Sequence, residues 1–257
     1  MEYPTAAPSN VWAADTRELA QRLVSGSSVV VLTGAGMSAE SGLPTFRSGS
    51  GALWNNYRPE DLATPQAFAR DPILVSTWYR ERRGRAAAAR PNDGHMALAQ
   101  MARALPSLTI VTQNVDGLHS EAGSADVIEL HGSIRWSRCT VCDERTPGSL
   151  EGPLPDTCTC GGLLRPAVVW FGEALPHAAW ERAERSAHAA DVFIVAGTSA
   201  AVYPAAGLVH IAKRAGAYVA EVNPERTEAS AICDLVVRAP AGQFFPALLA
   251  AMREQAR

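Results

Sequence analysis

Short runs of apolar, mostly β-branched residues recur along the chain, and segments with helical spacing of their apolar positions lie between them. The runs are apolar at consecutive rather than alternate positions, which is typical of strands buried on both faces of a parallel sheet. The predicted strands are 27–34, 107–114, 126–132, 191–199, 217–224 and 233–240. This alternation predicts an α/β fold built on a Rossmann-like, doubly wound parallel sheet.

Helices are predicted in the gaps between these strands, at 16–26, 94–105, 177–190, 204–216 and 244–255. Two intervals break the alternation. Residues 43–93 form a helical insertion, and residues 133–165 are rich in Cys, Pro and Gly and lack long apolar runs. We therefore expect a Rossmann-like domain made of 1–42, 94–132 and 166–257, interrupted by the insertion 43–93 and by a small module at 133–165.

The composition limits the classes of partner. A chain of 257 residues can bury a large core, and a net charge of −3 with a pI near 6.1 gives no basic field for nucleic acid or an anionic membrane. No apolar run reaches the roughly 20 residues that span a bilayer, and the first residues lack a basic start followed by an apolar stretch. We expect a cytoplasmic monomer that binds neither nucleic acid nor membrane.

A glycine-rich turn follows the first predicted strand. Gly34, Gly36 and Ala39 in "VVVLTGAGMSA" fit the G-x-G-x-x-G/A pattern, in which the backbone approaches a pyrophosphate and its amides stabilise the charge. The alternative is an ordinary tight turn. The acidic ribose ligand of common dehydrogenases is missing about 20 residues later, because the insertion begins there, and Asn223 is the candidate instead. The pattern favours a dinucleotide and disfavours ordinary hydride transfer.

Polar residues follow two further strands. Gln113, Asn114 and Asp116 come directly after the strand at 107–114, at the carboxyl edge where open α/β sheets bind ligands, although these residue types also favour plain turns. The next strand ends at His131, which we predict to be a general base, since an imidazole accepts protons near neutral pH. The other histidines lack this setting, and His119 is the nearest competitor.

Four of the five cysteines are clustered, at positions 139, 142, 158 and 160. Two thiolate pairs can surround one tetrahedral Zn²⁺, and four thiolates leave no open position for water, so we predict a structural zinc site that orders the module. The second pair, Cys-x-Cys, is one residue shorter than the usual knuckle. The alternative is a redox disulfide, which a cytosolic protein rarely carries.

The motifs together resemble those of sirtuins, the NAD-dependent protein-lysine deacylases. "GAGMSAESGLPTFR", "TQNVDGLH", "LHG", the cysteine pairs, "RPAVVWFGE", "GTSAAVYPAA" and "EVNPE" occur in the sirtuin order over roughly residues 20–250. The resemblance implies that His131 is the catalytic base and that NAD, the co-substrate, is surrounded by Gly34, Ala35, Gly36, Ala39, Phe46, Arg47, Trp54, Gln113, Asn114, Asp116, Gly197, Thr198, Ser199, Asn223, Pro224, Glu225 and Ala241.

The resemblance also implies a reaction. The acyl oxygen of a modified lysine attacks the nicotinamide ribose and expels nicotinamide, His131 then takes a proton relayed through the ribose hydroxyls, and free lysine and O-acyl-ADP-ribose result. Asn114 and Asp116 would bind the nicotinamide amide. The substrate backbone would lie extended between 168–173 and 197–203, adding a strand, with Val169, Trp170, Phe171, Gly172 and Glu173 in contact with it.

The insertion carries a second signature, "WYRERR" at 78–83. In sirtuins this insertion walls the acyl channel, and the subgroup that removes succinyl, malonyl and glutaryl groups has Tyr-x-x-Arg here, which matches Tyr79 and Arg82; "DLATP" at 61–65 agrees with the same subgroup. A buried acyl carboxylate needs a charged partner, and an arginine fork beside a phenol supplies one. We expect Arg80, Arg83 and Arg85 to be solvated.

Other functions remain open from the sequence. Plain lysine deacetylation is the nearest alternative, because a short acetyl group could enter the same channel. Mono-ADP-ribosyl transfer shares the cleavage of NAD. A noncatalytic NAD-binding module would keep Gly34, Gly36 and Asn223 but would not need His131, so the intact "QNVDGLH" and "LHG" segments disfavour it.

Overall fold

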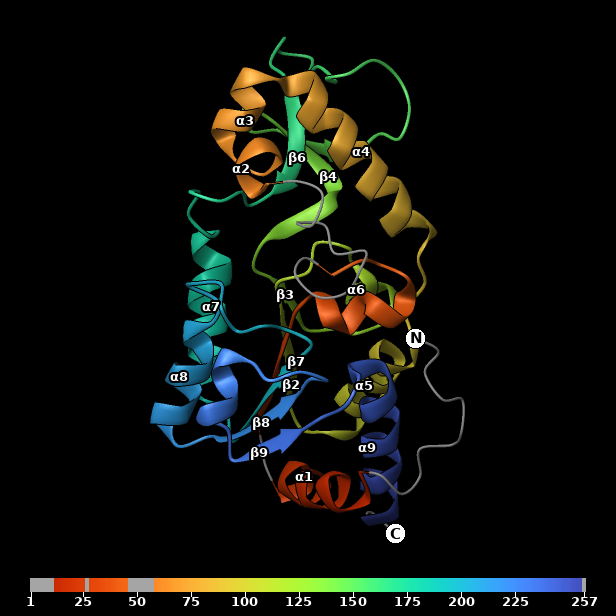
Figure 1. The fold of residues 1–257 in the computed structure, drawn as a ribbon, viewed down its shortest axis with the longest axis vertical. Coiled ribbons are helices and arrows are strands. Elements are labelled where there is room, and N and C mark those ends of the chain that lie inside the picture. Colours follow the sequence, from red (N-terminus) through yellow and green to blue (C-terminus); the bar gives the residue numbers. More distant parts are fainter. Residues whose placement is uncertain (1–11, 26–27, 46–57, 256–257) are drawn as a thin grey trace.

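The computed structural model describes residues 12–25, 28–45 and 58–255 and has two lobes (Figure 1). The larger lobe is built on a six-stranded sheet with the order β3-β2-β1-β7-β8-β9, and every neighbouring pair is parallel. The strands are β1 (Val29–Thr33), β2 (Leu108–Thr112), β3 (Val127–Glu129), β7 (Val192–Ala196), β8 (Tyr218–Val222) and β9 (Leu235–Val237). All six predicted strands are therefore present, and the predicted α/β architecture is confirmed.

Helices cover both faces of this sheet (Figure 1). On one face lie α1 (Ala13–Ser25), α5 (Asp93–Ala104) and α9 (Ala241–Gln255), and on the other α7 (His177–His188) and α8 (Gly207–Ala215). Alternate residues of β1 enter the two cores, because side chains of a strand point to opposite faces: Val31 joins the first and Leu32 the second. This explains the continuous apolar runs. Short helical segments are η1 (Ala35–Ser41), α6 (Leu118–Glu121) and η3 (Glu228–Ala231).

The strand order reverses at β1. From β1 the chain moves outward to β2 and β3, and it returns to the other side of β1 at β7 before moving outward again. The segments that leave β1 and β7 therefore diverge at the carboxyl edge, which is the topological switch point where sheets of this kind bind ligands.

The smaller lobe combines the cysteine-rich module with the insertion (Figure 1). A three-stranded antiparallel sheet with the order β5-β4-β6 is formed by β4 (Gly132–Cys139), β5 (Arg145–Pro147) and β6 (Leu164–Val168), which the weak apolar pattern did not predict. It packs against α2 (Pro59–Leu62), α3 (Pro65–Arg70) and α4 (Pro72–Ala88) around a third core, which includes Ile134 and Val168 from the strands. The module thus shares its core with the insertion.

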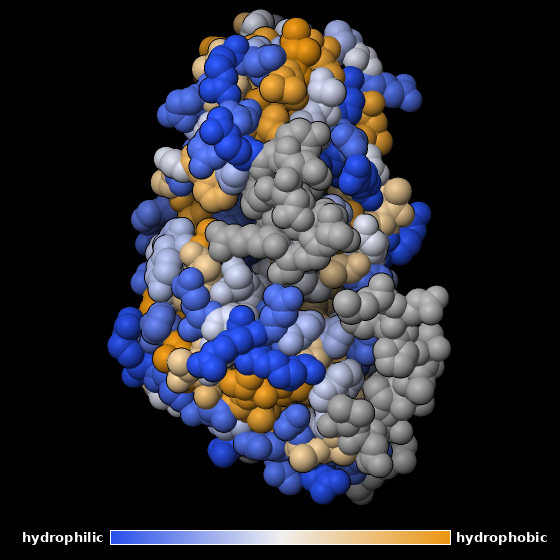
Figure 2. Space-filling model, viewed as in Figure 1, coloured by the Kyte–Doolittle hydropathy of each residue, from blue (hydrophilic) through white to orange (hydrophobic). Residues whose placement is uncertain are grey.

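Helix α4, which carries the "WYRERR" segment, begins at a clear start signal. The Asp71 side chain accepts a hydrogen bond from the Leu74 amide at 2.9 Å, and Pro72 occupies the first helical position. Ile73 and Leu74 in the first turn are exposed, and Figure 2 shows apolar surface on the upper lobe where α3 and α4 meet.

Within the described ranges, no helix is both long and apolar enough to cross a bilayer.

Candidate active site

The turn after β1 and the turn after β7 touch through their backbones. The Gly36 amide donates to the Gly197 carbonyl at 2.7 Å, and the Gly34 amide donates to the Ala196 carbonyl at 3.2 Å. A Cβ on Gly36 would lie 2.8 Å from the Gly197 Cα, and one on Gly34 would lie 2.6 Å from the Thr198 Cβ. Only glycine permits this approach, so the predicted glycine turn lies at the switch point.

The polar loop after β2 forms a buried network with this turn. The Asn114 side-chain amide donates to the Gly34 carbonyl at 2.9 Å and to Ser38 Oγ at 3.1 Å, and Ser38 Oγ donates to Asp116 at 2.8 Å. Burial raises the pKa of Asp116, while the hydrogen bonds from the Leu118 amide and Ser38 act in the opposite direction. Sequence reasoning missed Ser38, although it lies inside the glycine motif. The network fixes Asn114 and Asp116 at the carboxyl edge of the sheet.

His131 follows β3 at the same edge. Its Nδ1 lies 3.0 Å from the Gln113 carbonyl oxygen, which can only accept a hydrogen bond, so Nδ1 carries the proton and Nε2 is left as the basic nitrogen. Burial lowers the pKa of His131, and the bond to Gln113 offsets part of that shift. The neutral imidazole that a general base requires is therefore the stable form near pH 7.

The remaining strand ends complete this edge. The Gln113 side chain donates to Thr198 Oγ1 at 2.9 Å, and the Asn223 side chain donates to the Thr198 carbonyl at 3.0 Å, so the turns after β2, β7 and β8 are joined. Asn223 also accepts a hydrogen bond from the Glu225 amide at 3.2 Å. Ala35 and Ala39 lie in η1, Ser199 and Pro224 in these turns, and Ala241 is the first residue of α9. Phe46, Arg47 and Trp54 lie outside the described residues.

In the smaller lobe, Tyr79 and Arg82 lie one helical turn apart on α4. Tyr79 is buried, and its hydroxyl accepts a hydrogen bond from the Trp170 indole at 2.9 Å. The Arg82 guanidinium lies 4.5 Å from the ring centre of Trp78 and 5.5 Å from that of Tyr79. Burial lowers the pKa of Arg82, while Tyr79 and Asp116 act in the opposite direction. Arg82 is thus close enough to the polar loop for the two charges to interact.

Trp170 is held in place by an ion pair. Arg165 donates to both oxygens of Glu173, at 2.5 and 2.9 Å, and Glu173 in turn accepts the Trp170 amide at 2.8 Å. The Arg165 guanidinium stacks on the indole at 3.3 Å from the ring centre. Trp170 and Glu173 of the "VVWFGE" segment are therefore held by these contacts, while Phe171 between them is 45% exposed.

Two of the neighbouring arginines are not solvated, which corrects the sequence-based expectation. Arg83 is only 8% exposed and donates to the Ile134 carbonyl at 2.7 Å and the Ser149 carbonyl at 2.9 Å. Arg80 forms an ion pair with Asp156 at 3.1 Å. Only Arg85 behaves as expected, since it is exposed and pairs with Glu81 on the helix surface. A helical pattern alone could not show that a second segment covers this face of α4.

His119, the other candidate for the general base, is buried against Thr33 of β1 and lies beside His95. Thr33 donates to Thr112 at 2.8 Å and so accepts from His119 Nε2 at 3.0 Å, which leaves His119 Nδ1 as an acceptor. His95 Nδ1 accepts the Asn92 amide at 3.3 Å, so its Nε2 is a donor. Both of these remaining nitrogens lack a partner among the described residues, and the rings lie 4.7 Å apart. The two neutral histidines are therefore complementary in hydrogen bonding.

This buried pair should make the fold sensitive to acid. Burial lowers the pKa of His95 to about 4, and burial together with His95 also lowers the pKa of His119. In the unfolded chain these histidines bind protons near pH 6.5, so the pair contributes its full stabilisation above that pH. The free energy of unfolding should then fall as the pH is lowered from about 6.5 to 4, by about 3 kcal/mol for His95 alone. Urea unfolding at several pH values measures this fall.

A glutamine at position 95 provides the matched test, because glutamine keeps the capping-box bond to Asn92 but cannot titrate. We expect His95→Gln to flatten the dependence of stability on pH. His177→Gln should leave it unchanged, since the His177 side chain is 86% exposed. Parallel curves for wild type and His95→Gln would contradict the assignment.

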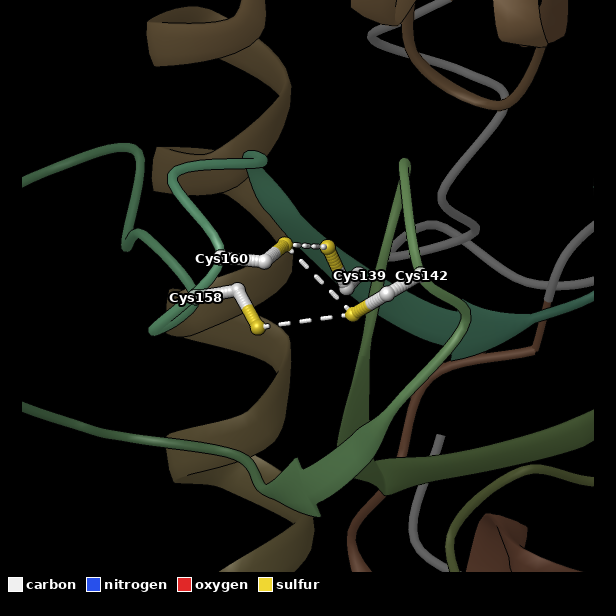
Figure 3. A group of neighbouring side chains, drawn as sticks. All are labelled: Cys139, Cys142, Cys158 and Cys160. Carbon is white, nitrogen blue, oxygen red and sulfur yellow. Dashed lines mark hydrogen bonds between the residues drawn. The ribbon is translucent and has the colours of Figure 1, made fainter.

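The four clustered cysteines meet in the smaller lobe, where the end of β4 and the turn after it lie beside the loop before β6 (Figure 3). Their sulfur atoms lie within 4.8 Å of one another, with separations of 3.4 Å for Cys139–Cys160, 3.7 Å for Cys142–Cys158 and 3.5 Å for Cys142–Cys160. A tetrahedral zinc–thiolate site requires about 3.8 Å between sulfurs, so the arrangement fits one zinc ion despite the short second pair. Backbone amides of Cys142 and Val141 lower the pKa of Cys139 to about 6, whereas the neighbouring sulfurs raise the pKa of Cys142, so Cys139 is the thiol of this pair that ionises first.

Metal removal should therefore unfold the module. We expect purified protein to hold about one zinc per chain by mass spectrometry, and we expect Cys142→Ser to lose the metal and lower the melting temperature. Cys233→Ser is the control, because Cys233 lies apart from the cluster and its thiol contacts the Ala229 carbonyl at 3.2 Å. Equal zinc contents in the two variants would exclude the site.

Comparisons with known proteins agree with this geometry. The family model described as "Sir2 family" matches residues 34–204. NAD-dependent protein deacylase 2 of Pyrobaculum aerophilum is 49% identical over 93% of this chain and 96% of its own length. A crystal structure of a Sir2 homologue in complex with NAD superposes with a TM-score of 0.88 at 47% identity, covering 93% of this chain and 94% of that chain. A Sir2 protein bound to a myristoylated histone peptide superposes with a TM-score of 0.80 at 33% identity, covering 95% and 98%.

Proposed function

The chain belongs to the Sir2 family, and from this premise we propose that it is an NAD-dependent protein-lysine deacylase that removes acidic acyl groups. The substrates would be succinyl-, malonyl- and glutaryl-lysine, with acetyl-lysine as a further substrate. The products would be nicotinamide, O-acyl-ADP-ribose and free lysine. Relatives named NAD-dependent protein deacylases support the reaction class, and the acyl preference rests on α4.

The observation that carries the acyl preference is the hydrogen bond from Trp170 to Tyr79. Indole is only a donor, so the Tyr79 hydroxyl accepts this bond and keeps its own proton available. Among the described residues, none accepts that proton. Beside it lies Arg82, which is also only a donor. A phenol and a guanidinium side by side on one face of the helix match the two donors that a carboxylate of the substrate would accept.

The catalytic groups would act at the carboxyl edge of the sheet. His131 Nε2 would accept a proton from the ribose, since Nδ1–H is held by Gln113. Asn114 and Asp116, fixed through Ser38, would bind the carboxamide of nicotinamide. The pyrophosphate would lie against the glycine turn, at the start of η1, which follows Gly34 directly.

The substrate peptide would lie extended between 168–173 and 197–203. Phe171 and Tyr203 are 45% and 64% exposed at these segments and offer apolar surface to a peptide. Val169, Gly172 and Glu173 would flank the acyl-lysine together with Trp170. The histone peptide of the structural relative supports a peptide substrate, although that relative holds a myristoyl group rather than an acidic one.

The other candidate functions have weaker support. A noncatalytic NAD-binding module would not require the oriented imidazole of His131. Mono-ADP-ribosyl transfer would not require a cationic residue at the acyl end of the channel. Plain deacetylation remains the nearest alternative, because Tyr79 and Arg82 need not exclude a short acyl group.

One panel of substrates tests the proposal. A single peptide sequence carrying acetyl-, malonyl-, succinyl- or glutaryl-lysine is incubated with the enzyme and NAD, and products are read by mass spectrometry. We expect deacylation to depend on NAD and kcat/KM to be higher for the acidic acyl groups than for acetyl. Cleavage of the acetyl peptide alone would leave a plain deacetylase, and no cleavage of any peptide would overturn the reaction class.

A further inference from the structure

Helix α4 presents two sets of residues to two different surroundings. Tyr79 and Arg82 lie beside Trp170 and the polar loop, whereas Arg80 and Arg83 face the cysteine-rich module. The two sets alternate along one turn and a half of helix, so any displacement of one set displaces the other. The contacts that hold α4 to the module therefore also determine where the acyl end of the site lies.

Arg83 makes the more buried of these contacts. Its guanidinium donates to the Ile134 carbonyl at 2.7 Å, to Ser137 Oγ at 3.1 Å and to the Ser149 carbonyl at 2.9 Å, and no carboxylate within salt-bridge distance occurs in the described part of the chain. A charge that is 8% exposed and has no carboxylate in direct contact among the described residues is costly to bury; burial lowers the pKa of Arg83, and the more distant Asp156 offsets only part of that shift. An apolar residue would fill this space at lower cost, but only the arginine fork joins β4 and the loop after β5 to one point of α4.

The loop after β5 is shaped around that guanidinium. A Cβ on Gly148 would lie 2.2 Å from Arg83 Cζ, so position 148 leaves no room for a side chain. Further along, Arg80 donates to the Gly152 carbonyl at 2.7 Å and to Asp156 at 3.1 Å. A segment with little regular structure thus receives donors from α4 along much of its length.

We propose that Arg83 is a positioning residue for acyl specificity, which fastens α4 to the cysteine-rich module and thereby holds Tyr79 and Arg82 at the distance that an acidic acyl group requires. The inference rests on the proposed function. An acetyl group ends short of Arg82 and makes no demand on its position, whereas a carboxylate must meet a fork of fixed geometry. Loosening α4 should therefore affect the two classes of substrate unequally.

Steady-state kinetics on matched acetyl and succinyl peptides test this with four variants of the full chain. Arg83→Met removes the anchor, Gly148→Ala pushes on the anchor while keeping every charge, Arg85→Met removes an exposed arginine of the same helix, and Arg82→Met removes the proposed ligand itself. We expect Arg83→Met and Gly148→Ala to raise KM for the succinyl peptide about tenfold, with KM for NAD and kcat/KM for the acetyl peptide nearly unchanged. Arg85→Met should change neither.

The outcomes separate the two proposals. Should Arg82→Met lose succinyl activity selectively while Arg83→Met and Gly148→Ala weaken both peptides equally, Arg83 supports only the fold and this inference is wrong. Should Arg82→Met itself show no selectivity, the proposed function fails and the inference with it. If Arg83→Met does not fold, Gly148→Ala decides, because it displaces the same guanidinium without leaving a cavity.

Discussion

Replacing His131 with alanine is expected to lower kcat by about 10²–10⁴-fold for every acylated peptide, since general base catalysis contributes roughly that much. The reason lies in the fixed tautomer: Gln113 holds Nδ1–H, so Nε2 is the nitrogen that can accept a proton. The loss should be independent of the acyl group. Steady-state assays with acetyl and succinyl peptides measure it.

A second measurement distinguishes an enzyme that lacks only its general base from one whose NAD site is disrupted. In the reaction order implied by the family, nicotinamide leaves before His131 takes its proton, so His131→Ala should still release nicotinamide in a single turnover while producing little free lysine. His210→Ala, an exposed histidine on α8, should match wild type in both assays. Retention of full kcat by His131→Ala would remove the residue from the mechanism.

The pH profile gives an independent check on His131. Burial lowers the pKa of this imidazole, so the neutral, basic form persists below the ordinary value near 6.5. The acid limb of kcat/KM should therefore lie below pH 6.5. Protein stability must be followed in parallel, because protonation of the His95–His119 pair also destabilises the fold as the pH falls.

The central sheet could be predicted from the sequence because its three middle strands, β2, β1 and β7, are buried on both faces. Val29 to Thr33 are all buried, and the same holds for Val192 to Ala196. A run of consecutive apolar residues therefore indicates a strand that is covered on both faces of the sheet. The parallel arrangement then brings every carboxyl end to one edge. Gly34, Gln113, Gly197 and Asn223 meet there for that reason, whatever lies between them in the chain.

The sheet of the smaller lobe left no such pattern. Strand β4 has exposed Arg135 and Trp136 beside buried Ser133 and Ile134, and β5 is only three residues long. The small sheet is held together by the core that it shares with α4 and by the cysteine cluster, and not by an apolar periodicity of its strands. Contacts between segments that are distant in the chain cannot be predicted from such a pattern either, and so the burial of Arg83 and the ion pair of the half-buried Arg80 were not predicted.

Tyr79 and Arg82, the pair proposed to recognise the acyl group, were the opposite case. A spacing of three residues places Tyr79 and Arg82 on one face of any helix, and a start signal at Asp71 and Pro72 makes that helix a safe prediction. The sequence could not supply the indole of Trp170, which comes from a segment more than ninety residues away and orients the phenol.

Arg82→Met is expected to lower kcat/KM for the succinyl peptide by about 100-fold and to leave the acetyl peptide within about twofold of wild type, since leaving one partner of a buried ion pair alone costs about 3 kcal/mol. Methionine keeps much of the volume of the arginine stem, so the apolar wall beside Trp78 should survive. Competition between the two peptides in one reaction, read by mass spectrometry, gives the ratio directly.

Tyr79→Phe isolates the second donor of the same site. Phenylalanine keeps the ring against Trp78 and Trp170 but removes the hydroxyl, which leaves the indole N–H without its acceptor. A hydrogen bond to a charged group contributes about 1.5–3 kcal/mol, so the succinyl peptide should lose about tenfold or more. Arg85→Met, with its exposed side chain, should change neither peptide. Equal losses on acetyl and succinyl peptides in Arg82→Met would contradict a role in recognising the acyl carboxylate, because only the succinyl group carries one.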